Sequence, residues 1–184
     1  MRHRRTENKN IHYLCIVKNK HKRMNNFGKG LILLLLSLIV PTIVIVRSVK
    51  FDQQCAGYLK QAADANTVEL ALDRVDMALK YIEDHGLTSG YTSVLWRTED
   101  ENIGYWYQNI KACREELANN VDASSLEKSN VLMKVRESLT DDGKEGVELT
   151  VPPGISRYPY NLRFGVMRWF SVILCLIAIG IMKM

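Results

Sequence analysis

"GLILLLLSLIVPTIVIV", residues 30–46, is a run of seventeen residues without a charge. A helix needs about 20 apolar residues to cross the hydrocarbon core of a bilayer, so this run is at the short end of a membrane span. A cleavable signal peptide would have an apolar stretch of about 7–15 residues and a small-x-small cleavage site. Here the run meets Arg47 without such a site. We therefore predict an uncleaved transmembrane helix over 30–46, with a kink at Pro41 that is tolerated where neighbours bond the freed carbonyl.

A second apolar run, "FGVMRWFSVILCLIAIGIM", occupies residues 164–182. Its one charged residue, Arg168, can extend its guanidinium toward the lipid headgroups. Aromatic residues gather where the run begins, as they do at membrane interfaces. The alternative is a buried helix of a soluble domain, but the roughly 110 residues between the runs form too small a core to enclose a helix apolar on every face. The sequence predicts a second transmembrane helix over 164–182.

The charge of the chain is unevenly distributed. Residues 1–29 hold nine Lys/Arg and one acid, whereas residues 51–163 hold twelve Lys/Arg and nineteen Asp/Glu, a net charge of −7. A basic arm joined to an acidic domain argues against nucleic acid as a partner, because a nucleic-acid binder carries its positive charge on the folded domain. Since basic residues near spans stay in the cytoplasm, we predict both termini inside and the central domain outside a bacterial inner or plasma membrane. We expect the arm to be disordered and to set this topology, with binding to anionic lipid as the alternative.

Between the two runs, apolar residues recur at helical spacing in four stretches, which are 49–64, 66–85, 101–120 and 125–140. Asn66 with Glu69, Thr98 with Glu101 and Ser124 with Glu127 have the spacing of capping boxes. These features predict a mainly α protein in which two transmembrane helices flank a small antiparallel four-helix bundle or helical-hairpin domain. A short two-stranded ribbon could form between "YTSVLW" and "VELTV", and "DDGKEG" is interpreted as a solvated turn.

The predicted organisation has five parts. They are a basic arm (1–29), a first span (30–46), an extracytoplasmic helical domain (47–150), a Pro/Tyr-rich linker (151–163) and a second span (164–182).

"GYTSVLWRTEDENIGYWY", residues 90–107, is the most chemically distinctive part of the domain. Trp106 falls on the apolar stripe of its helix, and its two tyrosine neighbours point about 100° away on either side. At least one of these tyrosines must therefore lie near the rim of the core, where such rings serve either as packing lids or as contact residues. Packing explains most of the segment, and the candidate partner-binding residues are Tyr91, Trp96, Tyr105 and Tyr107.

Two of the four cysteines, Cys55 and Cys113, belong to the central domain, and each lies on the apolar stripe of its helix. In an oxidising compartment a disulfide between them would stabilise the domain by roughly 2–4 kcal/mol. The alternative is a pair of buried thiols that pack as small apolar groups.

Motifs for catalysis or cofactor binding are missing from the sequence. There is no HExxH, CxxC or GxSxG motif and no glycine-rich phosphate loop. The one histidine of the central domain, His85, stands at a helix end, where it most often caps carbonyls. We therefore expect no enzyme activity, no cofactor and no metal.

The segments "LTSGYTSVLW…IGYWYQNIK" and "LEKSNVLMKVRESLTDDG" resemble a family of uncharacterised bacterial proteins, including cyanobacterial ones, with a helical core beside membrane segments. The resemblance covers about residues 51–160. It implies membership of a membrane-associated family and no activity, because no function is assigned to that family.

Together these patterns predict a non-enzymatic, membrane-tethered interaction or scaffolding module. Its partners would be the lipid bilayer and either another protein or a second copy of the chain. The alternative is a small-molecule sensing domain that signals through a separate membrane partner, since helical sensory domains also lie between two spans.

Overall fold

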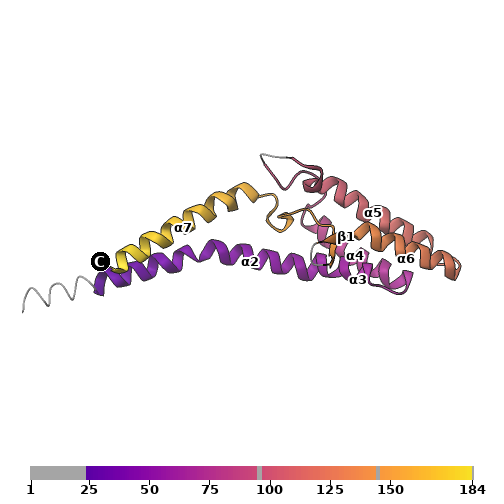
Figure 1. Ribbon diagram of the computed structural model, residues 1–184, viewed down its shortest axis with the longest axis horizontal. Helices are drawn as coiled ribbons and strands as arrows, with labels where there is room; N and C mark the ends of the chain where they lie inside the picture. The colour runs from indigo at the N-terminus through magenta and orange to yellow at the C-terminus, as the bar shows by residue number, and fades with distance from the viewer. Residues whose placement is uncertain (1–23, 95–96, 144–145, 184) are drawn as a thin grey trace, which may run out of the picture. The chain divides into compact units, whose positions relative to one another are not determined.

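The computed structural model describes residues 24–94, 97–143 and 146–183. The chain is mainly helical, as predicted, and these residues include one small antiparallel sheet (Figure 1). Its described residues divide into two compact units, one formed by residues 24–43 with 165–183 and the other by those between 44 and 164.

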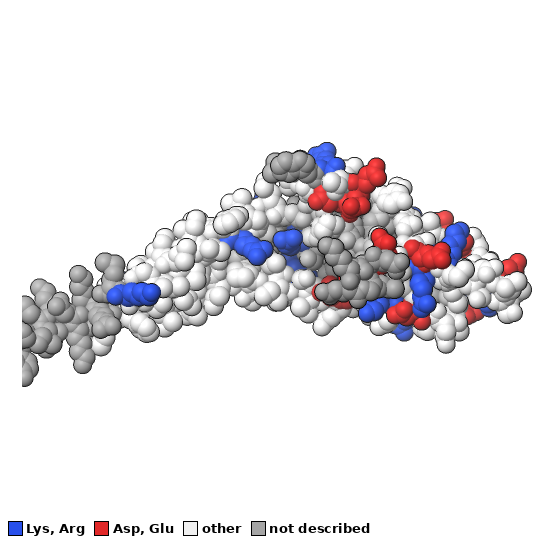
Figure 2. All heavy atoms as spheres, viewed as in Figure 1, with Lys and Arg blue, Asp and Glu red and all other residues white. Residues whose placement is uncertain are grey.

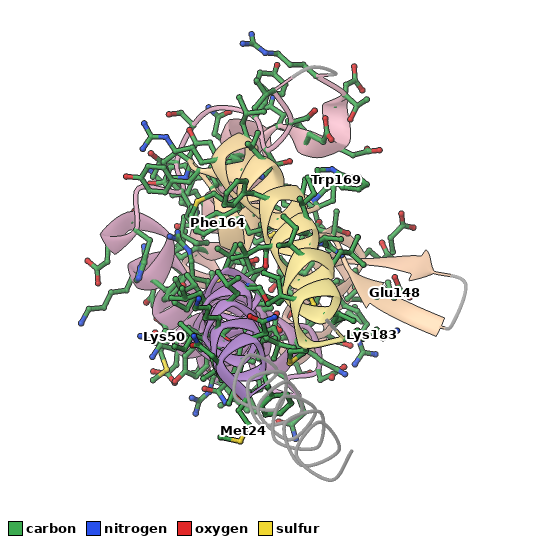
Figure 3. The ribbon with its side chains drawn as sticks, turned by 90° about the vertical axis from the view of Figure 1, so that its left-hand side faces the viewer. Met24, Lys50, Glu148, Phe164, Trp169 and Lys183 are labelled. Atoms are coloured by element: carbon green, nitrogen blue, oxygen red, sulfur yellow. The ribbon has the colours of Figure 1, made fainter. Side chains whose placement is uncertain are left out.

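In the described part of the chain, two helices are long and apolar enough to cross a membrane, as the sequence predicts. The first runs from Met24 to Ala63 and includes α2 (Ile39–Phe51), and the second is α7 (Asn161–Lys183). In each, only 11% of the most apolar window is buried inside the structure. The large apolar side chains therefore point outward, and the labelled Trp169, 74% exposed, projects away from its helix (Figure 3). This exposure suits lipid rather than a protein interior.

In the first unit, small residues let the two long helices approach each other. A Cβ atom at Gly30 would meet the Met182 side chain and would lie 2.9 Å from the carbonyl oxygen of Ala178. Further along the pair, Ser37 and Ser171 are both buried, and the Ser171 hydroxyl donates a hydrogen bond to the Ser37 carbonyl. Close backbone approach at Gly, Ala and Ser is the usual way in which helices pack where no hydrophobic effect drives them together.

The second unit contains the remaining elements. They are the π-helical turn η1 (Asp52–Ala56), α3 (Gly57–Ala63), α4 (Val68–Asp84), the 3-10 turn η2 (Glu99–Glu101), α5 (Ile103–Asn119), α6 (Ser125–Leu139), strands β1 (Thr140–Gly143) and β2 (Gly146–Leu149), and the 3-10 turn η3 (Ile155–Arg157).

Helices α3 to α6 share one hydrophobic core. Its largest fully buried side chains come from each of these helices, as the periodicity predicts, and include Leu59, Ile82, Ile110, Leu117 and Val135. In addition, α3 packs against α4 and α6, while α5 packs against α4 and α6. The core is therefore built from the apolar helix faces that the sequence periodicity predicts.

The helix starts are set by side-chain caps. Ser124 and Glu127 form the predicted capping box of α6. Thr98 and Glu101 also form their predicted capping box, but this box caps the start of the η2 turn. The cap of α5 is Asn102, whose side chain accepts a hydrogen bond from the Tyr105 amide. The cap of α4 is Thr67 rather than the predicted Asn66, because the Thr67 hydroxyl is the group that accepts a bond from the α4 backbone.

The transition from α2 into α3 passes through a wide turn. The Gly57 amide bonds the carbonyl of Asp52, five residues earlier, and a Cβ atom at Gly57 would lie 2.9 Å from that same oxygen. Glycine is therefore what permits a π-turn at this position. The turn contains Cys55, which is completely buried.

The predicted two-stranded ribbon exists, and its second strand includes residues of "VELTV" as expected, but its first strand is a different segment. β1 pairs with β2 in antiparallel register, with Thr140 opposite Leu149 and Gly143 opposite Gly146. The "DDG" residues interpreted as part of a turn thus form a strand, because a hairpin with adjacent segments requires less loop closure than pairing with the distant "YTSVLW". In the described part of that distant segment, Tyr91 forms an isolated bridge with Asn102 instead.

Candidate functional site

A hollow of about 430 Å³ lies at the start of α5. Its lining comes from the η2 turn, the first two turns of α5 and the segment after β2, and comprises Glu99, Asp100, Asn102, Tyr105, Trp106, Asn109, Thr150 and Pro152. It thus combines two carboxylates, two aromatic rings and several amide or hydroxyl groups.

Trp106 and Pro152 are the buried part of this lining. The indole nitrogen of Trp106 donates a hydrogen bond to the Thr150 carbonyl at 2.9 Å, which ties α5 to a segment 44 residues away in sequence. Buried indoles normally find such a partner. The bond fixes the part of the hollow that the chain after β2 contributes.

Tyr105 forms an exposed side of the hollow. Its ring is 71% exposed, although its backbone amide is held by the Asn102 side chain at 3.1 Å. The same Asn102 amide group donates to the Tyr91 hydroxyl at 3.5 Å. Asn102 therefore links two of the four predicted contact residues, Tyr91 and Tyr105, at one place.

Other polar groups of the lining are already engaged. The side chain of Asn109 donates to the Ser138 carbonyl at 3.1 Å, and Asn102 is used as described above. In contrast, within residues 24–94, 97–143 and 146–183, the carboxylates of Glu99 and Asp100 form no ion pair with Lys or Arg. Both side chains are exposed. The groups left to meet a ligand thus include the two acids, the Tyr105 ring and Thr150.

The space-filling view agrees with this charge pattern. Acidic side chains gather beside a basic group on the loop that precedes α5, whereas the visible surface of the two long helices carries little charge (Figure 2). The three acids of η2, Glu99 to Glu101, make up this acidic loop.

The other predicted contact residues lie elsewhere or outside the described chain. Tyr107 turns toward α4, where its hydroxyl donates to Glu83 at 2.8 Å and the Lys111 ammonium lies 5.7 Å from its ring centre. The hydrogen bond to Glu83, with burial and the charge of Glu83, raises the pKa of the Tyr107 phenol. Tyr107 therefore packs within the domain, and Trp96 lies outside the described residues.

Tyr91 is held in the loop before α5. It is 36% exposed, and the Arg97 guanidinium stacks 5.4 Å from its ring centre. The backbone around it pairs with the chain before α5, since the Ile103 amide donates to the Gly90 carbonyl at 2.9 Å. This pairing keeps the loop against α5, next to the hollow.

Cys55 and Cys113 are both buried and both free in the structure, so the disulfide weighed from the sequence is not formed there. Burial is also the main reason that the pKa of the Cys113 thiol lies above its ordinary value. Both cysteines contribute to the hydrophobic core. They pack as small apolar groups, which was the alternative interpretation.

In the described part of the chain, no group of three or more His, Cys, Asp or Glu side chains is arranged to hold a metal ion. The ring of His85 stacks on Tyr81 with centroids 3.9 Å apart, and its Nδ1 lies 2.9 Å from the Tyr81 carbonyl. This histidine caps the end of α4, as predicted.

Comparison of the chain with models of protein families, with curated proteins and with solved structures gives no match in any of the three. The resemblance to uncharacterised bacterial membrane proteins therefore stays a prediction.

Proposed function

We propose that the protein is a membrane-tethered interaction module. In this proposal the two long helices span the bilayer, and the helical domain of residues 47–150, a small bundle of α3 to α6, is held at the outer surface by both of its ends. A domain anchored twice has a restricted height and tilt, which suits a module that positions a partner.

One observation carries the proposal. Tyr105 stays 71% exposed beside a hollow of about 430 Å³, although the neighbouring Trp106 on the same helix is almost completely buried. Exposed aromatic rings beside a depression are typical of contact surfaces, because they supply large contact area at low entropic cost. The hollow is thus the place where we expect the partner to bind.

Site-specific photo-crosslinking in cells tests this function. A photoreactive phenylalanine analogue at Tyr105 of the full-length protein should trap one discrete protein partner. The same analogue at Leu126, which is also 71% exposed but lies on α6 away from the hollow, is the matched control. Equal crosslinking patterns at the two positions, or none at Tyr105, would contradict the proposal.

The proposed topology places both termini in the cytoplasm, in keeping with nine Lys/Arg in the first 29 residues. Because the native cysteines of the domain are buried, a new thiol is needed to test it, and the exposed Asp122 in the turn before α6 is a suitable position. We expect a membrane-impermeant thiol reagent to label Asp122→Cys in intact cells. Labelling only after permeabilisation would show that the domain lies in the cytoplasm and that the proposed orientation is wrong.

A second candidate function is the binding of a small molecule. The specific observation in its favour is the hollow itself, whose volume falls in the range of small-ligand pockets. A thermal-shift screen of the full-length protein in detergent separates the two functions. Stabilisation by a metabolite that Tyr105→Ala abolishes would favour sensing.

A further inference from the structure

Several polar groups that line the hollow next to Tyr105 already form hydrogen bonds within the protein. The Trp106 nitrogen and the Asn109 amide donate to backbone carbonyls, and Asn102 caps α5. The exposed residues of the lining are Glu99, Asp100, Tyr105 and Thr150, and the charged groups among them are the carboxylates of Glu99 and Asp100. The carboxylates attract positive charge as hydrogen-bond acceptors, and the Tyr105 ring does so through its electron-rich face.

The surroundings reinforce this preference. The domain as a whole is acidic, with a net charge of −7 over residues 51–163. The nearest basic side chain of the loop, Arg97, is stacked on Tyr91. A cation that entered the hollow would therefore meet attraction from both the local carboxylates and the field of the domain.

We propose that this hollow binds a positively charged side chain, an arginine guanidinium or a lysine ammonium, that a protein partner presents. The inference rests on the interaction function proposed above and adds the chemistry of the partner. The cation would lie against the Tyr105 ring and donate hydrogen bonds to one or both carboxylates. The aliphatic part of its side chain would cover Trp106 and Pro152. An arginine suits the site especially, because its planar group can stack on the ring and bond a carboxylate at once.

Trp106 offers a direct reporter of occupancy. Replacing Trp96 and Trp169 by Phe leaves Trp106 as the one indole of the full-length protein, which has three tryptophans. The probe is the basic peptide acetyl-Gly-Arg-Gly-Lys-Gly-amide, titrated at constant ionic strength into this variant in an uncharged detergent. The acidic peptide acetyl-Gly-Glu-Gly-Asp-Gly-amide is the control. We expect a saturable change of Trp106 fluorescence with the basic peptide and none with the acidic one.

The carboxylates are tested by a variant pair of equal charge. Glu99→Gln with Asp100→Asn removes the two acids of the hollow, and Asp84→Asn with Asp122→Asn removes two acids outside it. Because exposed ion pairs each contribute modestly, losing two of them should weaken the apparent Kd by roughly five- to tenfold. The second pair should leave it within about twofold, because remote charges at the surface are screened by salt.

The ring is tested separately at Tyr105. Tyr105→Phe keeps the aromatic face and should bind the basic peptide as before, whereas Tyr105→Leu should bind it about two- to fivefold more weakly. Since this side chain is exposed, neither change is expected to unfold the domain. Circular dichroism and the melting temperature of each variant verify this.

Several results would overturn the inference. They are a lack of saturation with the basic peptide, equal loss in the two charge variants, or equal binding to the acidic peptide. These outcomes are distinct from failure of the interaction function. If the Tyr105 crosslink captures a partner whose yield is unchanged by Glu99→Gln with Asp100→Asn, the interaction function stands and the cation preference is wrong.

Discussion

The hydroxyl of Ser171 donates a hydrogen bond to the backbone carbonyl of Ser37, on the other membrane-length helix. This carbonyl needs an outside donor because the residue four positions later is Pro41, which has no amide hydrogen. Close by, the Ser37 and Thr42 hydroxyls bond the carbonyls of Leu34 and Leu38, each at 2.7 Å. The neighbouring helix thus satisfies the backbone group that the proline frees.

This relationship predicts that Ser171→Ala destabilises the helix pair by about 0.6–1.7 kcal/mol, the range of hydrogen bonds between membrane helices. The measurement is reversible unfolding of the full-length protein in bicelles. The loss should shrink in a Pro41→Ala background, because alanine at that position has a backbone amide that can bond the Ser37 carbonyl within the same helix. An equal loss in both backgrounds would show that the bond does not depend on the proline.

A second prediction concerns the glycines of the first long helix. Gly30→Ala should destabilise the pair by roughly 1–3 kcal/mol, because the added methyl would meet Met182 and the Ala178 carbonyl, which lies 2.9 Å from its position. Gly28→Ala, two residues earlier, is the control, since nothing lies within 4 Å of a Cβ atom there. The same bicelle unfolding experiment compares the two. Equal stability of both variants would argue against this packing.

A third prediction concerns Arg47, which holds the turn before α7. Its guanidinium donates to the carbonyls of Ser156 and Tyr158, both at 3.1 Å, and its centre lies 5.5 Å from the Phe164 ring centre. Lysine cannot reproduce two bonds and a stacked plane at once.

Arg47→Lys should therefore lower the opening free energy of residues 155–160 by about 1.5–3 kcal/mol, measured by amide hydrogen exchange. Arg168→Lys is the control, because the Arg168 side chain is exposed. Unchanged exchange in Arg47→Lys would show that the turn holds without the guanidinium.

The capping box of α6 provides the fourth prediction. Ser124→Ala should cost about 1 kcal/mol of stability, the usual effect of losing a serine cap. Ser129→Ala, on the exposed part of the same helix, should be neutral or slightly stabilising.

The same box makes stability depend on pH. Hydrogen bonds from the Ser124 hydroxyl and amide hold the pKa of Glu127 below its ordinary value of 4.5. A lowered carboxyl pKa means that its stabilisation is complete above pH 4.5 and is lost as the pH falls through the lower, folded-state pKa. Urea unfolding between about pH 6 and pH 3 should show a smaller pH dependence in Ser124→Ala than in the parent protein. An identical dependence would show that the Ser124 hydroxyl does not contribute to it, since the bond from the Ser124 amide to Glu127 remains in Ser124→Ala.

Local sequence patterns were sufficient for most of the helices. The spacing of Val68, Val75, Leu79 and Ile82 predicted α4, and Ser124 with Glu127 predicted the start of α6. They were less reliable at element ends. Adjacent residues such as Asn66 and Thr67 are both good caps by type, and only the backbone conformation decides which one accepts the bond.

The candidate site was predicted only in part. An exposed tyrosine beside the buried Trp106 followed from helical geometry, and Tyr105 is that residue. The Tyr107 hydrogen bond to Glu83 could not be foreseen, because it joins two helices whose mutual rotation depends on packing of the whole core. Thr150 and Pro152 gave no local signal at all.

The sequence by itself determined which segments are helical, which two are apolar enough to cross a membrane and where the charge lies. These properties depend on residues close together in the chain, so periodicity and composition record them. Only the tertiary structure decided that Thr150 lies against Trp106, that Ser171 reaches Ser37 and that β1 pairs with β2. Such contacts join distant or competing segments, so they depend on how whole elements pack together and leave no local pattern in the sequence.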